Sequence, residues 1–186
     1  MGQSRQLAIM NVGAFSLLVG NKVHLRRFGP EDVTAAYIGW LNDPDVTRFS
    51  NQRFRTHTAA SCEAYRASFD GSPHLFLSVR DAATGAAIGT MTAYANLHHK
   101  TCDVGIMIGA RDYWGGGYGQ DAWNALTRWL ISEGRVRKLT AGCLAANGAM
   151  ITLMERSGMA REAVRVGQEL LDGEPCDTLH YAKFTR

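Results

Sequence analysis

The sequence predicts a single α+β domain, with a mixed, mostly antiparallel sheet and helices on both of its faces. Three observations lead to this fold class. A length of 186 residues, with 46% hydrophobic and 20% charged residues, suits one globular core. Strand-like segments follow one another between residues 74 and 108, which predicts an antiparallel meander. A glycine-rich turn then separates an apolar strand pattern from a helical pattern, which adds a crossover helix.

The first part of the chain predicts one strand and two helices. Residues 1–20 show no clear period, and we interpret them as a loose arm or an extra edge strand before the main domain at 21–186. Alternation of apolar and polar residues predicts the strand, and a proline in the first turn predicts the start of the first helix. The expected elements are a strand at 22–28, a helix at 30–42, a polar connection at 45–56 and a helix at 58–69.

The second part of the chain continues as strands and two further helices. The helix after the glycine turn has Ala122, Leu126, Trp129 and Leu130 at spacings of three and four, so they share one face. The closing hairpin turns around residues 172–175. The expected elements are strands at 74–80, 86–95 and 100–108, the helix after the turn, a strand at 138–145, a helix at 148–156, and strands at 161–171 and 176–184.

The glycine turn, residues 113–120, has the composition of a phosphate-binding loop. Four of its residues lack side chains, and the following helix start offers unpaired N–H groups and a positive dipole end. A nucleotide P-loop is excluded because Gln120 and Asp121 stand where it needs Lys and Ser or Thr. A dinucleotide fingerprint is disfavoured because the glycine spacing differs and the later region is basic. A surface turn without a ligand is the remaining alternative.

Two blocks resemble one known family. Trp114-Gly115-Gly116-Gly117-Tyr118-Gly119 is similar to the acetyl-CoA signature of the GNAT superfamily of N-acetyltransferases, [Gln/Arg]-x-x-Gly-x-[Gly/Ala]. Downstream, Asn147 and residues 153–159 resemble the family pattern Asn…Leu-x-Glu-Lys-x-Gly-Phe. Within this superfamily, the residues of the glycine turn look most like those of the ribosomal-protein N-terminal acetyltransferases.

The resemblance implies an enzyme that transfers the acetyl group of acetyl-CoA to a primary amine. The amine would belong to a protein N-terminus or to a small-molecule acceptor. Two alternatives stay open: an N-acetyltransferase for nucleotide-linked amino sugars, and a non-catalytic acyl-CoA-binding module.

The same resemblance implies a set of cofactor-binding residues. Backbone N–H groups of the turn would bind the pyrophosphate, and a strand that splays from its neighbour would offer N–H groups to the pantetheine and thioester. Trp114 departs from the family's Gln or Arg, and a core aromatic is its alternative role. The expected residues are Ile106, Met107, Ile108, Trp114, Gly115, Gly116, Gly117, Tyr118, Gly119, Gln120, Asn147 and Arg156.

Catalysis needs a base for the amine and an acid for the leaving thiolate. Asp103 precedes the apolar run, where this branch often carries a carboxylate, and is the candidate base; a solvated hairpin residue is its alternative. Family members often carry a Tyr or Ser at the positions of Met154 and Met150, and methionine donates no proton. The acid is therefore another residue, such as Tyr181, or water.

The acceptor side is expected in the polar connection at 45–56. It gathers Arg48, Arg53 and Arg55, which suit an acidic acceptor such as the diphosphate of a nucleotide-linked amino sugar. A solvated basic loop is the alternative.

Other classes of function find little support. A net charge of +3 is too small to indicate nucleic acid, and Cys62, Cys102, Cys143 and Cys176 form no metal-binding pair, so we expect no metal and reduced thiols. The apolar segment at 7–19 is interrupted and too short to span a membrane. We therefore expect a cytoplasmic protein without a membrane partner, and leave a homodimer open.

Overall fold

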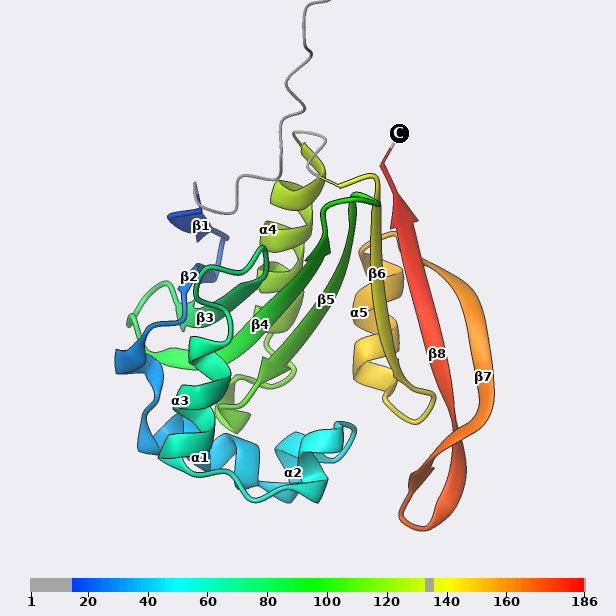
Figure 1. Ribbon diagram of the computed structural model, residues 1–186, viewed down its shortest axis with the longest axis horizontal. Helices are drawn as coiled ribbons and strands as arrows, with labels where there is room; N and C mark the ends of the chain where they lie inside the picture. Colours follow the sequence, from blue (N-terminus) through cyan, green and yellow to red (C-terminus); the bar gives the residue numbers. More distant parts are fainter. Residues whose placement is uncertain (1–14, 133–135, 186) are drawn as a thin grey trace, which may run out of the picture.

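The computed structural model describes residues 15–132 and 136–185, which form one sheet covered by helices (Figure 1). The sheet has eight strands in the order β1-β2-β3-β4-β5-β6-β8-β7. Every neighbouring pair is antiparallel except β5 and β6, which confirms the predicted α+β class. The strands are β1 (Leu17–Val19), β2 (Val23–Arg27), β3 (Leu75–Asp81), β4 (Ala87–Asn96), β5 (Thr101–Ile108), β6 (Lys138–Leu144), β7 (Ala160–Leu171) and β8 (Glu174–Phe184).

Helices cover both faces of the sheet, as predicted. The helices are α1 (Ala35–Asn42), α2 (Pro44–Thr47), α3 (Ala59–Ala67), α4 (Tyr118–Ser132) and α5 (Gly148–Arg156), with 3-10 turns η2 (Pro30–Asp32), η3 (Asn51–Phe54) and η4 (Arg111–Tyr113). On one face, α4 buries Trp123, Leu126 and Leu130 completely, in a core that also receives α5. On the other face, Tyr37 of α1 and Cys62 of α3 pack around Phe76, whose ring stacks on Phe28 at 4.2 Å.

The first helix begins later than predicted. Instead of one helix from residue 30, Pro30–Asp32 forms a separate 3-10 turn and α1 starts at Ala35, where Thr34 Oγ1 accepts a hydrogen bond from Tyr37 N at 3.2 Å. The cause is Asp32, which is buried and accepts hydrogen bonds from Gly29 N and Arg26 Nη2, both at 2.8 Å. These contacts close the turn onto the sheet and interrupt the helix.

The parallel pair is the exceptional part of the sheet. Thr101–Asp103 of β5 pairs with Lys138–Thr140 of β6, and no further pair joins these strands in the described ladder. β5 continues to Ile108, fully paired with β4, while β6 continues to Leu144, fully paired with β8. The two strands therefore diverge into a V, which Figure 1 shows between β5 and β6. This is the splay that the resemblance implied.

Three further observations concern the described residues. The four cysteines are free thiols, with Cys62 and Cys102 buried. Within the described residues, no group of His, Cys, Asp and Glu is arranged to hold a metal ion. No helix in residues 15–132 and 136–185 is long and apolar enough to cross a membrane.

Candidate active site

The glycine turn presents unpaired backbone donors at the start of α4. Gly115 and Gly117 have φ values of 73° and 81°, in the left-handed region that favours glycine, and a Cβ added at either would meet nothing within 4 Å. The Gly117 carbonyl accepts from Asp121 N at 3.0 Å and so begins the helix. Among the described residues, no carbonyl or side chain accepts a hydrogen bond from the N–H groups of residues 115–120. The turn is open and suits an anion.

Two side chains, those of Trp114 and Lys22, lie beside the glycines of this turn. Trp114 is 45% exposed and donates from Nε1 to the Ile108 carbonyl at 2.7 Å, so the alternative of a core aromatic is wrong. Lys22 donates from Nζ to the Gly116 carbonyl at 2.8 Å and lies 5.2 Å from the Tyr118 ring. Lys22 thus brings a positive charge to a turn whose own residues carry none. No local pattern in the sequence predicts this contact, because Lys22 precedes Gly116 by 94 positions.

The V between β5 and β6 exposes backbone donors of β5. Gly109 N donates to the Ile88 carbonyl at 2.9 Å, in register with the β4–β5 ladder. Hydrogen-bonded and non-bonded pairs alternate along antiparallel strands, so the N–H groups of Ile106 and Ile108 face away from β4 and into the V. The same alternation turns the Met107 N–H toward β4, whereas the Met107 side chain lines the pocket described below.

The other expected cofactor residues lie around α4 and α5. The Gln120 side chain is turned to α5, where Nε2 donates to Ser157 Oγ at 2.8 Å. Asn147 caps α5, because its Oδ1 accepts from Met150 N at 3.1 Å. Arg156 is exposed in the last turn of α5. Gly119 lies close to β5, where an added Cβ would lie 3.5 Å from Ile108 Cγ1.

Asp103 lies at the apex of the V, since it belongs to the last pair that joins β5 to β6. Its carboxylate accepts a hydrogen bond from Thr140 Oγ1 at 2.7 Å. Although the residue keeps solvent contact, desolvation by the surrounding protein raises the pKa of the Asp103 carboxyl, and the Thr140 hydrogen bond and the nearby His180 oppose this rise. His180 Nε2 is buried and has no hydrogen-bond partner among the described residues. An acid with a raised pKa suits proton transfer near neutral pH.

Tyr181 lies on the other face of the sheet from Asp103. It is 2% exposed, belongs to the core on the α4 side, and donates from its hydroxyl to Glu155 Oε1 at 3.0 Å. Asp103 alternates with Cys102 and Val104, which are in that same core, so its own side chain points to the α1–α3 face. Burial, followed by the Glu155 hydrogen bond, raises the pKa of Tyr181. The structure therefore separates the two expected catalytic side chains.

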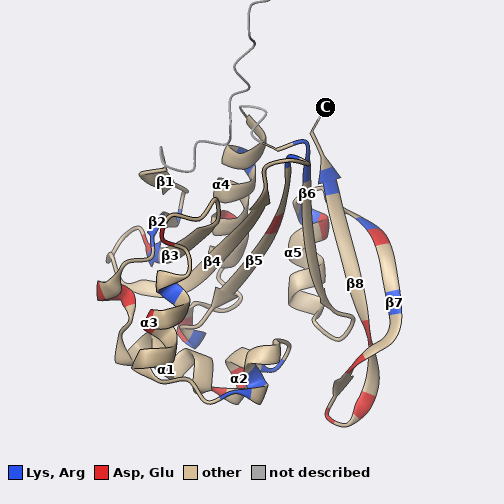
Figure 2. Ribbon diagram, in the orientation of Figure 1, with Lys and Arg blue, Asp and Glu red and all other residues tan. Residues whose placement is uncertain are grey.

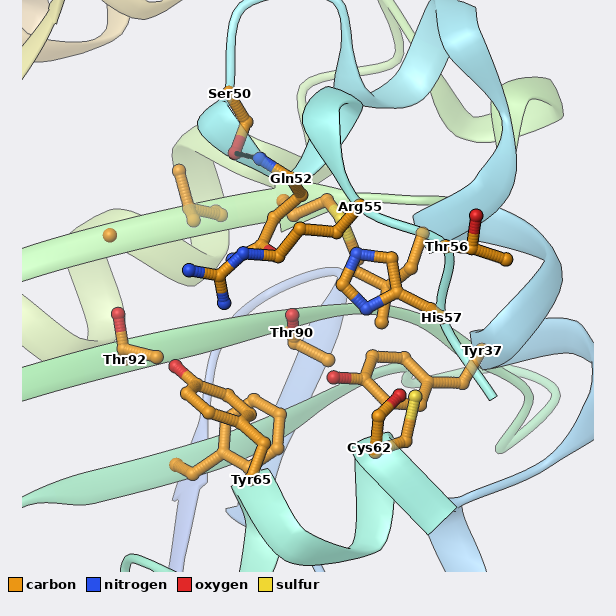
Figure 3. Close-up of a pocket in the computed structure, with 16 residues that line it drawn as sticks. Tyr37, Ser50, Gln52, Arg55, Thr56, His57, Cys62, Tyr65, Thr90 and Thr92 are labelled. Atoms are coloured by element: carbon orange, nitrogen blue, oxygen red, sulfur yellow. Dashed lines mark hydrogen bonds between the residues drawn. The ribbon is translucent and has the colours of Figure 1, made fainter. Parts of the chain in front are cut away.

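A pocket of about 310 Å³ lies on the α1–α3 face, next to the open end of β5 (Figure 3). It is lined by α1, by the segment from η3 to His57, by α3, and by β4 and β5. Figure 3 shows the hydroxyls of Tyr37, Tyr65 and Thr90 directed into it, with Arg55 and His57 on the opposite side. Gly105 lines it and lies two residues from Asp103 on the same face, a separation of about 7 Å.

The structure brings only one of the three expected substrate arginines into this pocket. Arg55 lines it, whereas Arg48 forms an ion pair with Asp172 at 3.2 Å and Arg53 donates to the Leu170 carbonyl at 2.8 Å. Figure 2 shows the basic connection that carries α2 and the acidic tip of the β7–β8 hairpin. His57 also lines the pocket and was not predicted as a site residue, because no local sequence pattern distinguishes a pocket histidine from a surface one.

A glycine turn with unpaired N–H groups at the start of a helix, beside a sheet opened by two diverging parallel strands, is the arrangement typical of the N-acetyltransferase class. The chain belongs to the GNAT acetyltransferase family: the family model of the acetyltransferase (GNAT) domain matches residues 22–160, about three quarters of its length. No curated protein sequence matches it significantly.

Solved structures share the fold at low sequence identity. A GNAT-family acetyltransferase from Bacillus anthracis has a TM-score of 0.77 at 19% identity, covering 90% of this chain and 98% of its own. A spermidine N-acetyltransferase from Vibrio cholerae, in complex with CoA and spermine, has 0.78 at 17%, covering 88% and 96%. An acetyltransferase from Salmonella typhimurium that modifies the N-terminal serine of a 50S ribosomal subunit protein has 0.77 at 14%, covering 92% and 100%. These structures therefore share the overall fold of this chain.

Proposed function

We propose that this protein transfers the acetyl group of acetyl-CoA to a primary amine of a small molecule or a protein N-terminus. The observation that carries the proposal is the open turn at residues 115–120, whose N–H groups have no partner in the described structure and lie beside the V. Because acetyl-CoA is an intracellular metabolite, a cytoplasmic location goes with this activity.

The residues present fit a coenzyme A pyrophosphate. In the proposal, the N–H groups of Gly115–Gln120 and the positive end of α4 bind the two phosphates. Gly115 and Gly117 have no side chains and open surroundings, which leaves space for the phosphates beside the turn. The N–H groups of Ile106 and Ile108 line the V and would hold the pantetheine arm and polarise the thioester carbonyl. Asn147 and Arg156 would contact the outer parts of the coenzyme.

Asp103 is the proposed general base. Acetyl-CoA supplies a thioester, whose C–S bond breaks as the amine nitrogen forms an amide bond. The amine must lose a proton during this exchange, and the Asp103 carboxylate would accept it directly or through one water molecule. Thr140 holds the carboxylate at the apex, where the V opens toward the pocket.

The leaving thiolate needs a proton from another source. Met154 is fully buried and cannot donate one, and the Tyr181 hydroxyl already donates to Glu155. We propose that water in the V protonates the thiolate, and that Tyr181 supports α5.

Similarity does not select the acceptor. The spermidine and ribosomal-protein enzymes resemble this chain to nearly the same extent, with TM-scores of 0.78 and 0.77, although their acceptors differ. An amino-sugar nucleotide stays a second candidate, supported by Arg55 in the pocket. The chemistry of the pocket must therefore determine the acceptor.

The proposal is tested by binding and turnover. Calorimetry should give a dissociation constant for acetyl-CoA in the range of about 1 μM to 1 mM, and thiol release should follow addition of a suitable amine. Gly117→Glu should abolish binding, because it places a carboxylate beside the phosphates. Gly71→Glu is the matched control, since Gly71 also has a positive φ of 68° and open surroundings. Wild-type protein that fails to bind acetyl-CoA would overturn the proposal.

A further inference from the structure

The pocket on the α1–α3 face is short of negative charge. Among the described residues that line it, none is Asp or Glu. Burial raises the pKa of Tyr37, Tyr65 and Cys62, so these groups stay neutral near pH 7. The fixed charge of the lining is the guanidinium of Arg55.

Arg55 differs from the two arginines that precede it. Arg48 and Arg53 are engaged by the β7–β8 hairpin. The Arg55 guanidinium makes no hydrogen bond or ion pair within residues 15–132 and 136–185, and Figure 3 shows it extended over Thr90 and Thr92. Five N–H donors in a planar fork suit a carboxylate or phosphate.

His57 offers a second donor beside it. Its backbone is fixed by Asn42, whose Oδ1 accepts from His57 N at 2.8 Å and whose Nδ2 donates to His57 O at 2.9 Å. His57 Nε2 is buried without a hydrogen-bond partner among the described residues. Leaving a buried polar nitrogen unpaired is unfavourable, so a hydrogen bond to a bound ligand would stabilise this atom.

The rest of the lining is neutral and combines hydroxyl groups with apolar side chains such as Leu41, Phe76 and Ile106. Tyr65 and Tyr94 share a hydrogen bond of 2.6 Å between their hydroxyls, and Thr90 and Thr92 project from β4 beside Met107 and Gly105. A volume of about 310 Å³ is at the lower end for small-molecule sites. The pocket therefore suits a small molecule that carries a negative charge and also presents some apolar surface.

We propose that the acceptor is a small primary amine that carries a carboxylate or a phosphate, and that Arg55 and His57 bind this anion while the amine faces Asp103. The inference rests on the proposed function and names its substrate class. A polyamine fits poorly, because it would place a second ammonium near Arg55 with no carboxylate to pair it. A plain peptide N-terminus would leave Arg55 and His57 unpaired.

The test uses pairs of acceptors that differ in one charge. Amino acids are compared with their amides, aminoalkyl phosphates with the matching amino alcohols, and spermidine serves as a cationic acceptor. Thiol release is measured for wild type, Arg55→Ala, Arg55→Lys and His57→Gln. Arg165→Ala is the matched control, since Arg165 is an exposed arginine on the edge strand β7. The comparison of amino acids with amides tests for recognition of a carboxylate, and the comparison of aminoalkyl phosphates with amino alcohols tests for recognition of a phosphate.

The expected result is a lower KM for the charged member of one pair. Arg55→Ala should raise that KM about ten- to a hundredfold, the usual value of a charge-assisted hydrogen bond, with kcat and the KM for acetyl-CoA little changed. Arg55→Lys should recover part of the loss, and inorganic phosphate or acetate should compete with the acceptor in wild type only. Melting temperatures of the variants confirm that they fold.

Other outcomes separate this inference from the proposed function. Preference for neutral amines, for spermidine or for peptides, or a charge preference unchanged by Arg55→Ala, would overturn the acceptor class while leaving the acetyltransferase intact. Binding of acetyl-CoA without turnover of any amine would overturn both, and failure to bind acetyl-CoA would overturn the proposed function first.

Discussion

At the scale of single residues, the pH dependence of the reaction depends on Asp103. The base must be ionised, so activity should fall as pH drops through its pKa, which desolvation places above the usual value for aspartate. Thr140→Val removes a hydrogen bond that stabilises the carboxylate, which raises this pKa further. The acidic limb of kcat/KM should therefore move to higher pH.

The pH profile is measured from pH 5 to 9 in wild type, Thr140→Val and Thr140→Ser. Serine keeps the hydroxyl and should restore the wild-type limb. Asp103→Asn should lower kcat by about a hundredfold or more. An unchanged profile in Thr140→Val, together with an active Asp103→Asn variant, would remove Asp103 from the role of base.

Tyr181 gives a second prediction at the residue scale. If the hydroxyl only anchors Glu155 of α5, Tyr181→Phe should leave kcat within about twofold and lower the free energy of unfolding by about 1.5 kcal/mol, the lower end of the range for a hydrogen bond to a charged group. Glu155 is exposed, so water replaces the lost donor. A fall in kcat of about a hundredfold at unchanged stability would instead make Tyr181 the general acid.

At the scale of elements, Gln120 and Ser157 couple α4 to α5. Gln120 Nε2 donates to Ser157 Oγ at 2.8 Å and to Asn124 Oδ1 at 3.2 Å, while Ser157 Oγ donates to the Leu153 carbonyl at 2.7 Å. Gln120→Ala and Ser157→Ala should each cost about 1 kcal/mol, and the double variant less than their sum because the two residues are in contact.

Urea unfolding measures this coupling, and calorimetry measures acetyl-CoA binding in the same variants. The backbone N–H of Gln120 survives the substitution, so affinity should change less than about threefold. A loss of tenfold or more in Gln120→Ala, but not in Ser157→Ala, would show that the amide itself binds the coenzyme.

The sequence was informative where the determinants are local. The helix predicted at 148–156 coincides with Gly148–Arg156, because Asn147 caps it and its apolar spacing is regular. The predicted start of the first helix was wrong because Asp32 accepts hydrogen bonds from Arg26 and from Arg80, which is 48 positions away. Arg53 and Arg55 are two residues apart yet reach different places, since Arg53 binds a carbonyl 117 positions along the chain. Such partners leave no trace in a local pattern.

At the scale of the whole molecule, the V divides the sheet into two parts. Strands β1–β5 and strands β6–β8 are joined by three residue pairs between β5 and β6, by the shared core on the α4 side and by the contacts of α4 with α5. The residues proposed to hold acetyl-CoA lie on both parts: the turn and β5 on one, α5 on the other. A ligand bound across the V therefore joins segments that the sheet itself leaves unpaired.

Acetyl-CoA should consequently stabilise the fold as a whole. At a hundred times its dissociation constant, a ligand that binds only the native state contributes about 2.7 kcal/mol, which for a chain of this length raises the melting temperature by about 5–10 °C. Calorimetric scanning measures the shift, and hydrogen exchange should show added protection in β5, in the glycine turn and in α5.

The control variant Gly117→Glu should show neither change on addition of acetyl-CoA. Its own melting temperature should be lower, because a left-handed conformation costs a non-glycine residue about 1–2 kcal/mol. Protection confined to the turn would mean that the ligand contacts one part of the sheet alone, and the bridging role assigned to α5 would be wrong.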